Sequence, residues 1–257
     1  MNKMLLANRT KEINYFQKMV SWNSHTQILL LESPPGFGKT DLLLKFAEIC
    51  PEGVLAVHVN LKSACVGIPY VFWRIKNTIG PSHFPRFKAG VQNYLRPYNV
   101  NIADNDVLGQ MDIQIALGSN EQIQKYHLME LQEMFFQDLQ KVKKTVVILF
   151  DTFNDASTDI RKWLSGAFLA AVTNCENLRV VIAGQSVPES NSEWVRNCHK
   201  CHLGRIDDEQ AWYELTQEMD LSLSQEIVAK FVAALEGNPK KLKEAFETLR
   251  KSVNSYQ

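Results

Sequence analysis

The chain has 257 residues, with 28 basic and 28 acidic side chains, so its formal net charge is zero. Disordered chains combine low hydrophobicity with high net charge, whereas 45% of these residues are hydrophobic. Proteins that bind a nucleic-acid backbone usually carry a basic domain or stripe. The composition therefore predicts a folded globular protein and gives no support to nucleic acid as a partner.

The apolar runs are short, and those at residues 28–31 and 146–150 fall far below the roughly 18 residues that a membrane-spanning helix needs. The first nine residues lack the pattern of a signal peptide. Five cysteines in a chain of this length, without such a signal, are typical of free thiols in a reducing compartment. We therefore expect a cytoplasmic protein that does not contact a membrane.

Four apolar runs are continuous rather than alternating, and they occupy residues 27–32, 54–60, 145–151 and 178–184. Such runs are typical of parallel strands that are buried on both faces. Helical patterns accompany them at residues 39–50, 71–79, 121–141 and 159–173. The alternation predicts right-handed crossovers and an α/β fold, with a parallel sheet between two layers of helices.

The strand pattern stops after residue 201, and helical patterns follow at residues 207–218, 224–236 and 239–252. The expected N-caps of these helices are Asp207, Ser224 and Asn238. We expect an α/β core at residues 1–203 and a small helical lid subdomain at residues 204–257.

One region interrupts the alternation, between residues 98 and 119. Two apolar segments, residues 99–102 and 111–117, are separated by acidic residues and a glycine, and the second alternates with period two. This pattern predicts a β-hairpin inserted at the edge of the core.

The sequence Ser-Pro-Pro-Gly-Phe-Gly-Lys-Thr, residues 33–40, follows an expected strand and precedes an expected helix, which is the context of a phosphate-binding loop. Its glycines let backbone N–H groups surround one phosphate, and the helix presents its positive end there. We expect Lys39 to reach the β- and γ-phosphates and Thr40 to hold Mg²⁺. The pattern has glycine at its first fixed position, where this chain has Ser33. The nucleotide-binding residues expected here are Pro35, Gly36, Phe37, Gly38, Lys39, Thr40 and, through its backbone N–H, Asp41.

Two further strands end in polar residues that suit this chemistry. Asp151 follows five apolar residues and is expected at the carboxyl end of a central strand, where α/β sheets bind ligands. There its carboxylate would hold Mg²⁺ together with Thr40. Gln185 follows the strand at residues 178–184 and is expected to touch the γ-phosphate or the attacking water.

With these elements in order, the chain resembles a STAND-type P-loop NTPase of the AAA-like superclass, especially bacterial ATP-binding modules next to effector domains in conflict and signalling systems. Residues 5–12 are similar to the family's Gly-Arg-x-x-Glu segment, which implies that Arg9 lies near the adenine. Residues 150–153 are similar to its Walker B motif. Residues 236–239 resemble the Gly-x-Pro turn of its helical lid, which implies that Pro239 contacts the nucleotide from the other side.

The chain departs from the family at positions that serve hydrolysis. The family often has Glu three residues after the Walker B Asp, where this chain has Asn154 followed by Asp155. Gln185 stands where the family often has Arg. Asp155 is a candidate for positioning water, although its offset by one residue would point it elsewhere on a strand end. The departures imply slow hydrolysis with intact nucleotide binding, and the candidate catalytic residues are Asp151, Asp155 and Gln185.

Two other segments suggest chemistry that we do not expect. Residues 198–202, Cys-His-Lys-Cys-His, fit a haem-attachment pattern and offer a zinc-like pair. Haem attachment requires export, and structural zinc needs about four ligands, while no second Cys or His pair lies nearby. We predict an edge strand there. The basic run at residues 240–243 is predicted to be a solvated face rather than a phosphate contact.

Three functions remain open. The first is an ATP-binding switch with slow Mg²⁺-dependent hydrolysis, whose nucleotide state controls association with a partner chain or with itself. The second is a scaffold module that holds nucleotide without turnover. The third, a P-loop kinase, is disfavoured because residues 156–161 and 188–196 contain few arginines. The absence of the GTPase motif Asn-Lys-x-Asp favours ATP.

Overall fold

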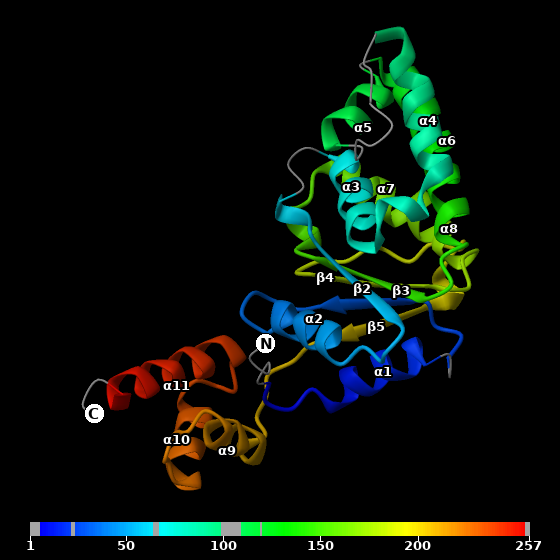
Figure 1. Ribbon diagram of the computed structural model, residues 1–257. Coiled ribbons are helices and arrows are strands. Elements are labelled where there is room, and N and C mark those ends of the chain that lie inside the picture. Colours follow the sequence, from blue (N-terminus) through cyan, green and yellow to red (C-terminus); the bar gives the residue numbers. More distant parts are fainter. Residues whose placement is uncertain (1–5, 22–23, 64–66, 99–108, 119, 255–257) are drawn as a thin grey trace.

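The computed structural model describes residues 6–21, 24–63, 67–98, 109–118 and 120–254. Five parallel strands form one sheet in the order β2-β3-β4-β1-β5 (Figure 1). Their bounds are β1 (Ile28–Glu32), β2 (Val54–Asn60), β3 (Thr145–Asp151), β4 (Leu178–Gly184) and β5 (Cys198–His202). The predicted α/β fold with a parallel sheet is confirmed, and residues 198–202 form the predicted edge strand.

The order of the strands decides which residues meet. The three central strands β3, β4 and β1 are buried almost throughout, which explains their continuous apolar sequences. The pairing register aligns Glu32 with Gly184, and Asn60 with Asp151. The carboxyl ends of these four strands therefore lie along one edge of the sheet, and three of them end in a polar residue.

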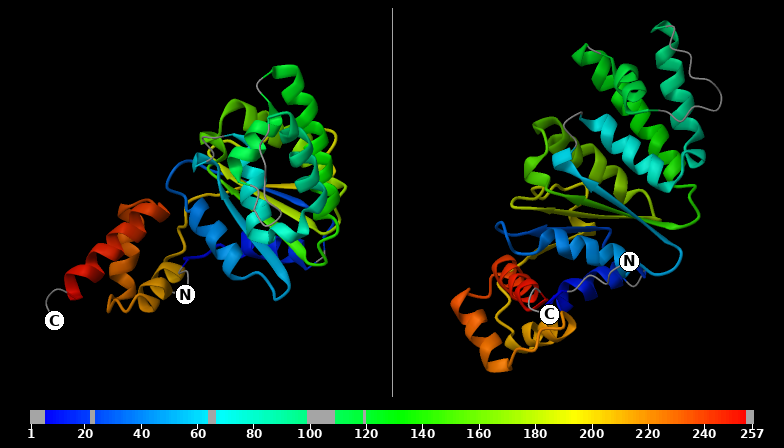
Figure 2. Two further views of the ribbon diagram at one scale, coloured as in Figure 1. Left: turned by 45° about the horizontal axis from the view of Figure 1, so that its top comes forward. Right: turned by 60° about the vertical axis from the view of Figure 1, so that its left-hand side comes forward.

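Helices cover both faces of the sheet (Figures 1 and 2). One layer consists of α1 (Thr10–Val20) and α2 (Lys39–Glu48). The other layer and its extension comprise α3 (Ile68–Ile79), α4 (Pro85–Leu95), α5 (Gln110–Leu117), α6 (Glu121–Leu139), α7 (Thr158–Trp163) and α8 (Leu169–Thr173). A π-helical turn, Leu164–Phe168, joins α7 to α8. Within the described residues, no helix is both long and apolar enough to cross a membrane.

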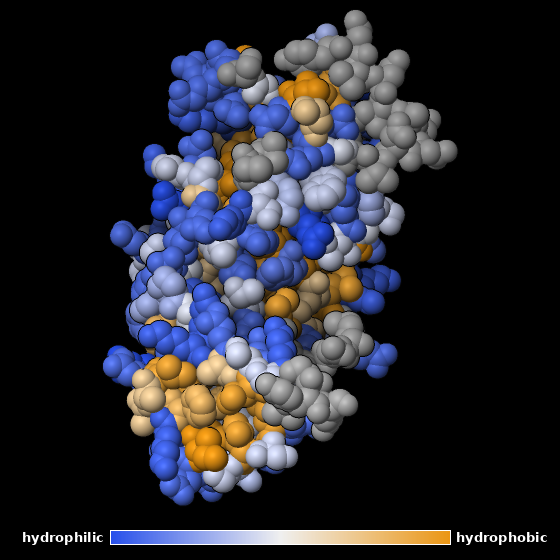
Figure 3. All heavy atoms as spheres, turned by 90° about the vertical axis from the view of Figure 1, so that its left-hand side faces the viewer, coloured by the Kyte–Doolittle hydropathy of each residue, from blue (hydrophilic) through white to orange (hydrophobic). Residues whose placement is uncertain are grey.

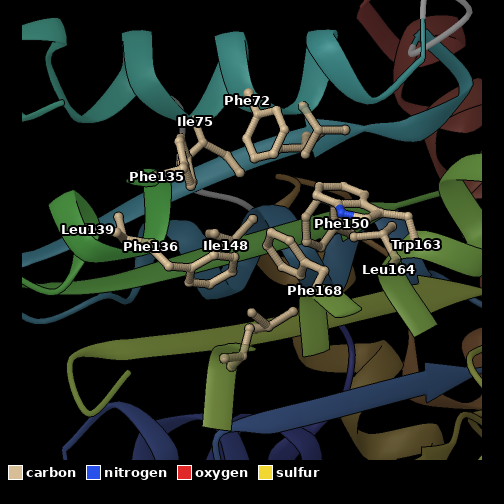
Figure 4. Packing of buried hydrophobic residues seen from close by; sticks show 14 of the residues in the cluster. Phe72, Ile75, Phe135, Phe136, Leu139, Ile148, Phe150, Trp163, Leu164 and Phe168 are labelled. Carbon is tan, nitrogen blue, oxygen red and sulfur yellow. The ribbon is translucent and has the colours of Figure 1, made fainter. Parts of the chain in front are cut away.

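Aromatic rings dominate the larger core, on the α3–α8 side (Figure 4). The ring of Phe72 lies 4.8 Å from that of Phe135 and 5.3 Å from that of Trp163, measured between centroids. Phe150 on β3 packs edge-on against Phe168 at 5.6 Å. Aromatic pairs in this range stabilise beyond their buried area, by about 0.5–1.5 kcal/mol each. This packing fixes the strand that ends in Asp151.

The predicted hairpin is wrong where the structure describes it. Residues 110–117 form α5, and Gly109 at its N-cap donates its N–H to Asp112 Oδ2 at 2.8 Å. Ile113, Ala116 and Leu117 are buried, at a spacing that places them on one face of a helix. Contacts with α3, α4 and α6 therefore overrode the period-two pattern. The first half of the expected hairpin, residues 99–108, lies outside the described residues.

Three helices follow β5 and form a separate apolar cluster beside the α1–α2 layer (Figures 1 and 2). They are α9 (Glu209–Glu218), α10 (Gln225–Ala234) and α11 (Pro239–Asn254). Ser224 and Asn238 accept hydrogen bonds as the predicted N-caps, whereas Asp208 rather than Asp207 caps α9. Leu203 packs into the α1–α2 core and Ile206 into the helical cluster, and the division of the chain near residue 203 stays a prediction.

The turn between α10 and α11 requires glycine for two reasons. Gly237 has a φ of +59°, and a Cβ there would lie 2.9 Å from the Ile206 carbonyl oxygen and would also clash with Asp207. Gly53 has a φ of +89°, but a Cβ there would meet nothing within 4 Å. A residue with a Cβ would therefore be strained at both positions, and only at position 237 would its Cβ also clash with neighbouring atoms.

We predict that Gly53→Ala lowers the free energy of unfolding by about 1–2 kcal/mol, because of the left-handed φ alone. Gly237→Ala should lose about 1–3 kcal/mol more, because the Ile206 backbone must shift. Urea unfolding of both variants measures the difference. Equal losses would show that the turn tolerates a Cβ.

Candidate functional site

The loop between β1 and α2 has the backbone of an anion-binding turn. Gly36 has a φ of +84° and Gly38 a φ of +78°, both in the left-handed region that favours glycine. Gly38 is the N-cap of α2. The first N–H groups of a helix lack intrahelical acceptors, and its N-terminus carries a partial positive charge. The loop can therefore bind an anion through its backbone.

Lys39 lies across this loop. Its Nζ donates to the carbonyl oxygens of Ser33 at 2.7 Å and Pro34 at 2.8 Å, and to Ser33 Oγ at 3.1 Å. Partial burial lowers the pKa of Lys39, and the negative charge of Asp151 acts in the opposite direction. Ser33, where the sequence pattern has glycine, thus contributes an extra acceptor that orients the ammonium group.

Thr40 and Asp151 meet at the base of the loop. Thr40 Oγ1 donates to Asp151 Oδ2 at 2.8 Å, and Thr152 donates its N–H to Asp151 Oδ1 at 2.8 Å. Only 2% of the Asp151 surface is exposed. Mg²⁺ prefers oxygen ligands and is usually bound by one or two carboxylates together with substrate phosphates. A buried carboxylate in contact with a hydroxyl, beside an anion-binding loop, fits that donor set.

A strained residue fixes the Asp151 carboxylate. Thr152 has a φ of +57°, which is an outlier for a β-branched residue. Its hydroxyl donates to Asn60 Oδ1 at 2.9 Å, and Asn60 Oδ1 also accepts the N–H of Lys62 at 3.0 Å. Such strain persists where the surroundings over-determine it, often at functional sites. The sequence contains no signal for this role of Thr152.

Asp155 reaches the same cleft. The chain after Thr152 is not an extended strand end but the 3-10 turn Phe153–Asp155, so the expectation that Asp155 points elsewhere is wrong. Asn154 Nδ2 donates to Asp155 Oδ1 at 2.6 Å, and Asn154 Oδ1 accepts the N–H of Gln185 at 2.9 Å. Asn154 thus connects the ends of β3 and β4.

The start of α11 closes the cleft opposite Asp151. Lys240 donates its backbone N–H to the Gly36 carbonyl oxygen at 3.0 Å, and Lys243 Nζ lies 2.9 Å from Asp41 Oδ2. Lys240 and Lys243 line the cleft together with Glu244 and Glu247. The side chain of Lys240 is 66% exposed, in agreement with the predicted solvated face. The side chain of Lys243 is 34% exposed and is paired with Asp41.

The cleft has a volume of about 440 Å³ and brings together most of the predicted residues. Those that line it are Pro35, Gly36, Gly38, Lys39, Thr40, Asp41, Asp151, Asp155, Gln185 and Pro239. Arg9 and Phe37 do not line it.

Arg9 and Phe37 lie at a small adjoining cavity of about 20 Å³, which also contacts Trp212 on α9 and Pro239 on α11. Arg9 Nη2 donates to the carbonyl oxygens of Phe37 at 3.0 Å and Gly204 at 2.9 Å. Burial lowers the pKa of Arg9, and Glu12 acts in the opposite direction. This arginine therefore joins the N-terminal segment, the loop and the chain that leads into α9. The cavity has room for about one water molecule.

The cysteines of β5 show no metal-site geometry. Within the described ranges, no group of three or more His, Cys, Asp or Glu side chains is placed to hold a metal ion. Burial raises the pKa of Cys198 to about 12 and that of Cys201 to about 11, which keeps both thiols protonated and unreactive. On the same strand, Lys200 Nζ and His202 Nδ1 lie 2.9 and 3.2 Å from Glu32 Oε2.

Comparison with known proteins identifies the class of fold. The chain is similar to a solved structure of Drosophila ORC bound to DNA, with a TM-score of 0.55 and 14% identity, over 96% of this chain and 62% of that one. It also matches the RuvB Holliday junction branch migration motor of Thermotoga maritima (TM-score 0.47, 13% identity, 96% and 62% coverage). A third match is Cdc6p from Pyrobaculum aerophilum (TM-score 0.45, 12% identity, 85% and 50% coverage).

The likeness to the ORC structure and the five-stranded parallel sheet confirm the predicted P-loop NTPase type of α/β fold. At 14% identity, the likeness concerns the fold alone. The chain spans 50–62% of the length of these three solved chains. No protein-family model and no curated protein matches the sequence.

Proposed function

We propose that the chain is a cytoplasmic ATP-binding switch of the STAND type that hydrolyses ATP slowly with Mg²⁺. Its nucleotide state sets the position of α9–α11 and thereby its association with a partner chain or with itself. The observation that carries the proposal is the cleft shared by two parts of the chain. Loop residue Gly36 and lid residue Lys240 are joined by a backbone hydrogen bond, beside the Thr40–Asp151 pair.

The phosphates would be bound by the loop N–H groups and Lys39, as an anion at a helix N-terminus is. Thr40 and Asp151 would hold Mg²⁺, which supplies positive charge to the phosphate oxygens as charge shifts onto them. Lys39 would exchange its contacts with Ser33 and Pro34 for phosphate oxygens. Gln185 and Asp155, at the cleft wall, would position the attacking water.

The adenine would occupy the small cavity beside Arg9. The small size of this cavity supports the proposal that the lid moves when nucleotide binds. A cavity of about 20 Å³ holds about one water molecule, so a base cannot enter unless the walls separate. Those walls include Trp212 and Pro239 of the helical part and Phe37 of the loop. Binding of the base would therefore displace α9–α11 relative to the sheet. This displacement links nucleotide binding to the surface of the lid.

The lid carries an apolar surface suited to a protein partner. Figure 3 shows orange, apolar side chains gathered on the lower part of the molecule, over the lid helices. Ile227 is exposed, and Phe231 and Leu235 follow it at four-residue spacing and are half-buried. The Drosophila ORC structure contains DNA, whereas the zero net charge of this chain favours a protein partner or self-association. The lid would present this surface differently in the two nucleotide states.

The charges at the cleft support the proposal of slow turnover. Among the described residues that line it, none is an arginine, and the cations are Lys39, Lys240 and Lys243. Lys243 is paired with Asp41. Charge that spreads over the γ-phosphate therefore lacks the arginine that accelerates many such enzymes. A scaffold that only holds nucleotide is the alternative, and the hydrolysis measurement below separates the two.

We predict that Lys39→Ala weakens ATP binding by about 1.5–3 kcal/mol, the contribution of a charge-assisted hydrogen bond. The fold should survive, because Lys39 is bonded to loop atoms rather than packed in the core. Isothermal titration calorimetry measures the affinity, and Lys143→Ala, at an exposed lysine, is the matched control. Unchanged ATP affinity in a folded Lys39→Ala protein would refute the site.

We predict that Asp151→Ala removes the part of ATP affinity that depends on Mg²⁺. The carboxylate is the proposed metal ligand, so affinity measured with excess chelator should change little. The test is the same titration with Mg²⁺ and with chelator, on wild type and variant. A variant that keeps the full benefit of Mg²⁺ would show that another residue holds the metal.

We predict that the isolated chain hydrolyses ATP at roughly 10⁻⁴ to 10⁻² s⁻¹, the range of P-loop NTPase sites that receive no arginine from a partner chain. Self-assembly or a partner that supplies an arginine should accelerate this by about 10³–10⁵-fold. Single-turnover hydrolysis across protein concentrations measures both effects. Fast turnover that stays constant down to nanomolar protein would identify an ordinary ATPase, and no turnover would identify the scaffold.

A further inference from the structure

His58 on β2 lies next to the Thr40–Asp151 pair, although no sequence motif includes it. Val57 and Val59 face the aromatic core, so His58 lies on the opposite, α2 face of the sheet. Its strand pairs with β3, with His58 opposite Leu149 two residues before Asp151. His58 Nε2 is 4.0 Å from Asp151 Oδ2, the oxygen that also accepts from Thr40.

The Nε2 atom of His58 is buried and has no hydrogen-bond partner among the described residues. Leaving a buried polar atom unpaired costs about 1–3 kcal/mol, and each native case requires an explanation. A separation of 4.0 Å is too long for a direct hydrogen bond to Asp151. It is short enough for one water molecule to contact both atoms.

We propose that His58 is a positioning residue of the metal site, and that its Nε2 accepts a hydrogen bond from a water that Mg²⁺ would hold at Asp151. The inference rests on the proposed function, because it needs the metal there. Mg²⁺ dehydrates reluctantly and keeps several waters, whose oxygen lone pairs point at the metal, so its shell presents O–H donors to nearby acceptors. Outer-shell partners of this kind typically change metal affinity by about 10–100-fold.

Two amide variants test the acceptor and its reach. In His58→Gln the side-chain oxygen can reach the place of Nε2, whereas in His58→Asn it falls one methylene short. His58→Leu removes the acceptor and leaves an apolar side chain of similar size. The same changes at His83, exposed in the 3-10 turn Pro81–His83, are the matched control. Thermal unfolding of each variant establishes that it is folded.

The experiment uses the full chain with a non-hydrolysable ATP analogue and Mn²⁺, which accepts the same oxygen ligands as Mg²⁺. Electron paramagnetic resonance of free Mn²⁺ gives the metal affinity of the nucleotide complex. Calorimetry with chelator gives the affinity for nucleotide alone. His58→Asn and His58→Leu should lower metal affinity by about 10–100-fold and leave metal-free binding unchanged. His58→Gln should restore most of the loss, and the His83 variants should match the wild type.

The other outcomes overturn the inference in distinguishable ways. Wild-type metal affinity in His58→Asn or His58→Leu would show that the acceptor is not used. An equal loss in His58→Gln would assign the effect to the ring rather than to the hydrogen bond. A parallel loss of metal-free binding would give His58 a merely structural role. If the wild type bound nucleotide without any effect of metal, the proposed metal site would fail as well, and if it bound none, the proposed function would fail entirely.

Discussion

The hydrogen bond between Thr40 Oγ1 and Asp151 Oδ2 joins two parts of the chain that the sheet holds apart. β4 lies between β1 and β3, so the loop after β1 and the end of β3 are not on neighbouring strands. They meet because parallel strands end at one edge and α2 starts there. A hydroxyl and a buried carboxylate at hydrogen-bond distance form a hard-oxygen pair, and the proposed metal and phosphate chemistry depends on this pair.

The same edge couples the site to the helices that follow the sheet. Lys240 donates to Gly36, and Lys243 pairs with Asp41, so the first turn of α11 rests on the loop. Arg9 ties the loop to Gly204, where the chain leaves the sheet. In the proposed function, the base would have to separate these contacts and move the lid, because the cavity beside Arg9 holds only about 20 Å³. Nucleotide binding and movement of the lid would then break the same contacts, those of Lys240, Lys243 and Arg9.

Much of the fold and of the site could be predicted because it is encoded locally. Residues 54–60, 145–151 and 178–184 form strands with the predicted bounds, since short apolar runs rich in β-branched residues favour strands over helices. The loop was predictable because only glycine suits the left-handed conformations at Gly36 and Gly38. The structure of residues 110–117 could not be predicted in this way. Their alternating pattern is typical of a strand, whereas contacts with three other helices stabilise α5.

The sequence by itself determined the parallel α/β fold, the anion-binding loop and the acid at the end of β3, because each follows from neighbouring residues and simple periodicities. Only the tertiary structure decided which side chains surround Asp151. Thr152 is strained, Asp155 turns back into the cleft, and Lys240 closes it, through contacts with residues far away in the chain. His58 comes within 4.0 Å of Asp151 because β2 pairs with β3 in one register, which no local pattern specifies.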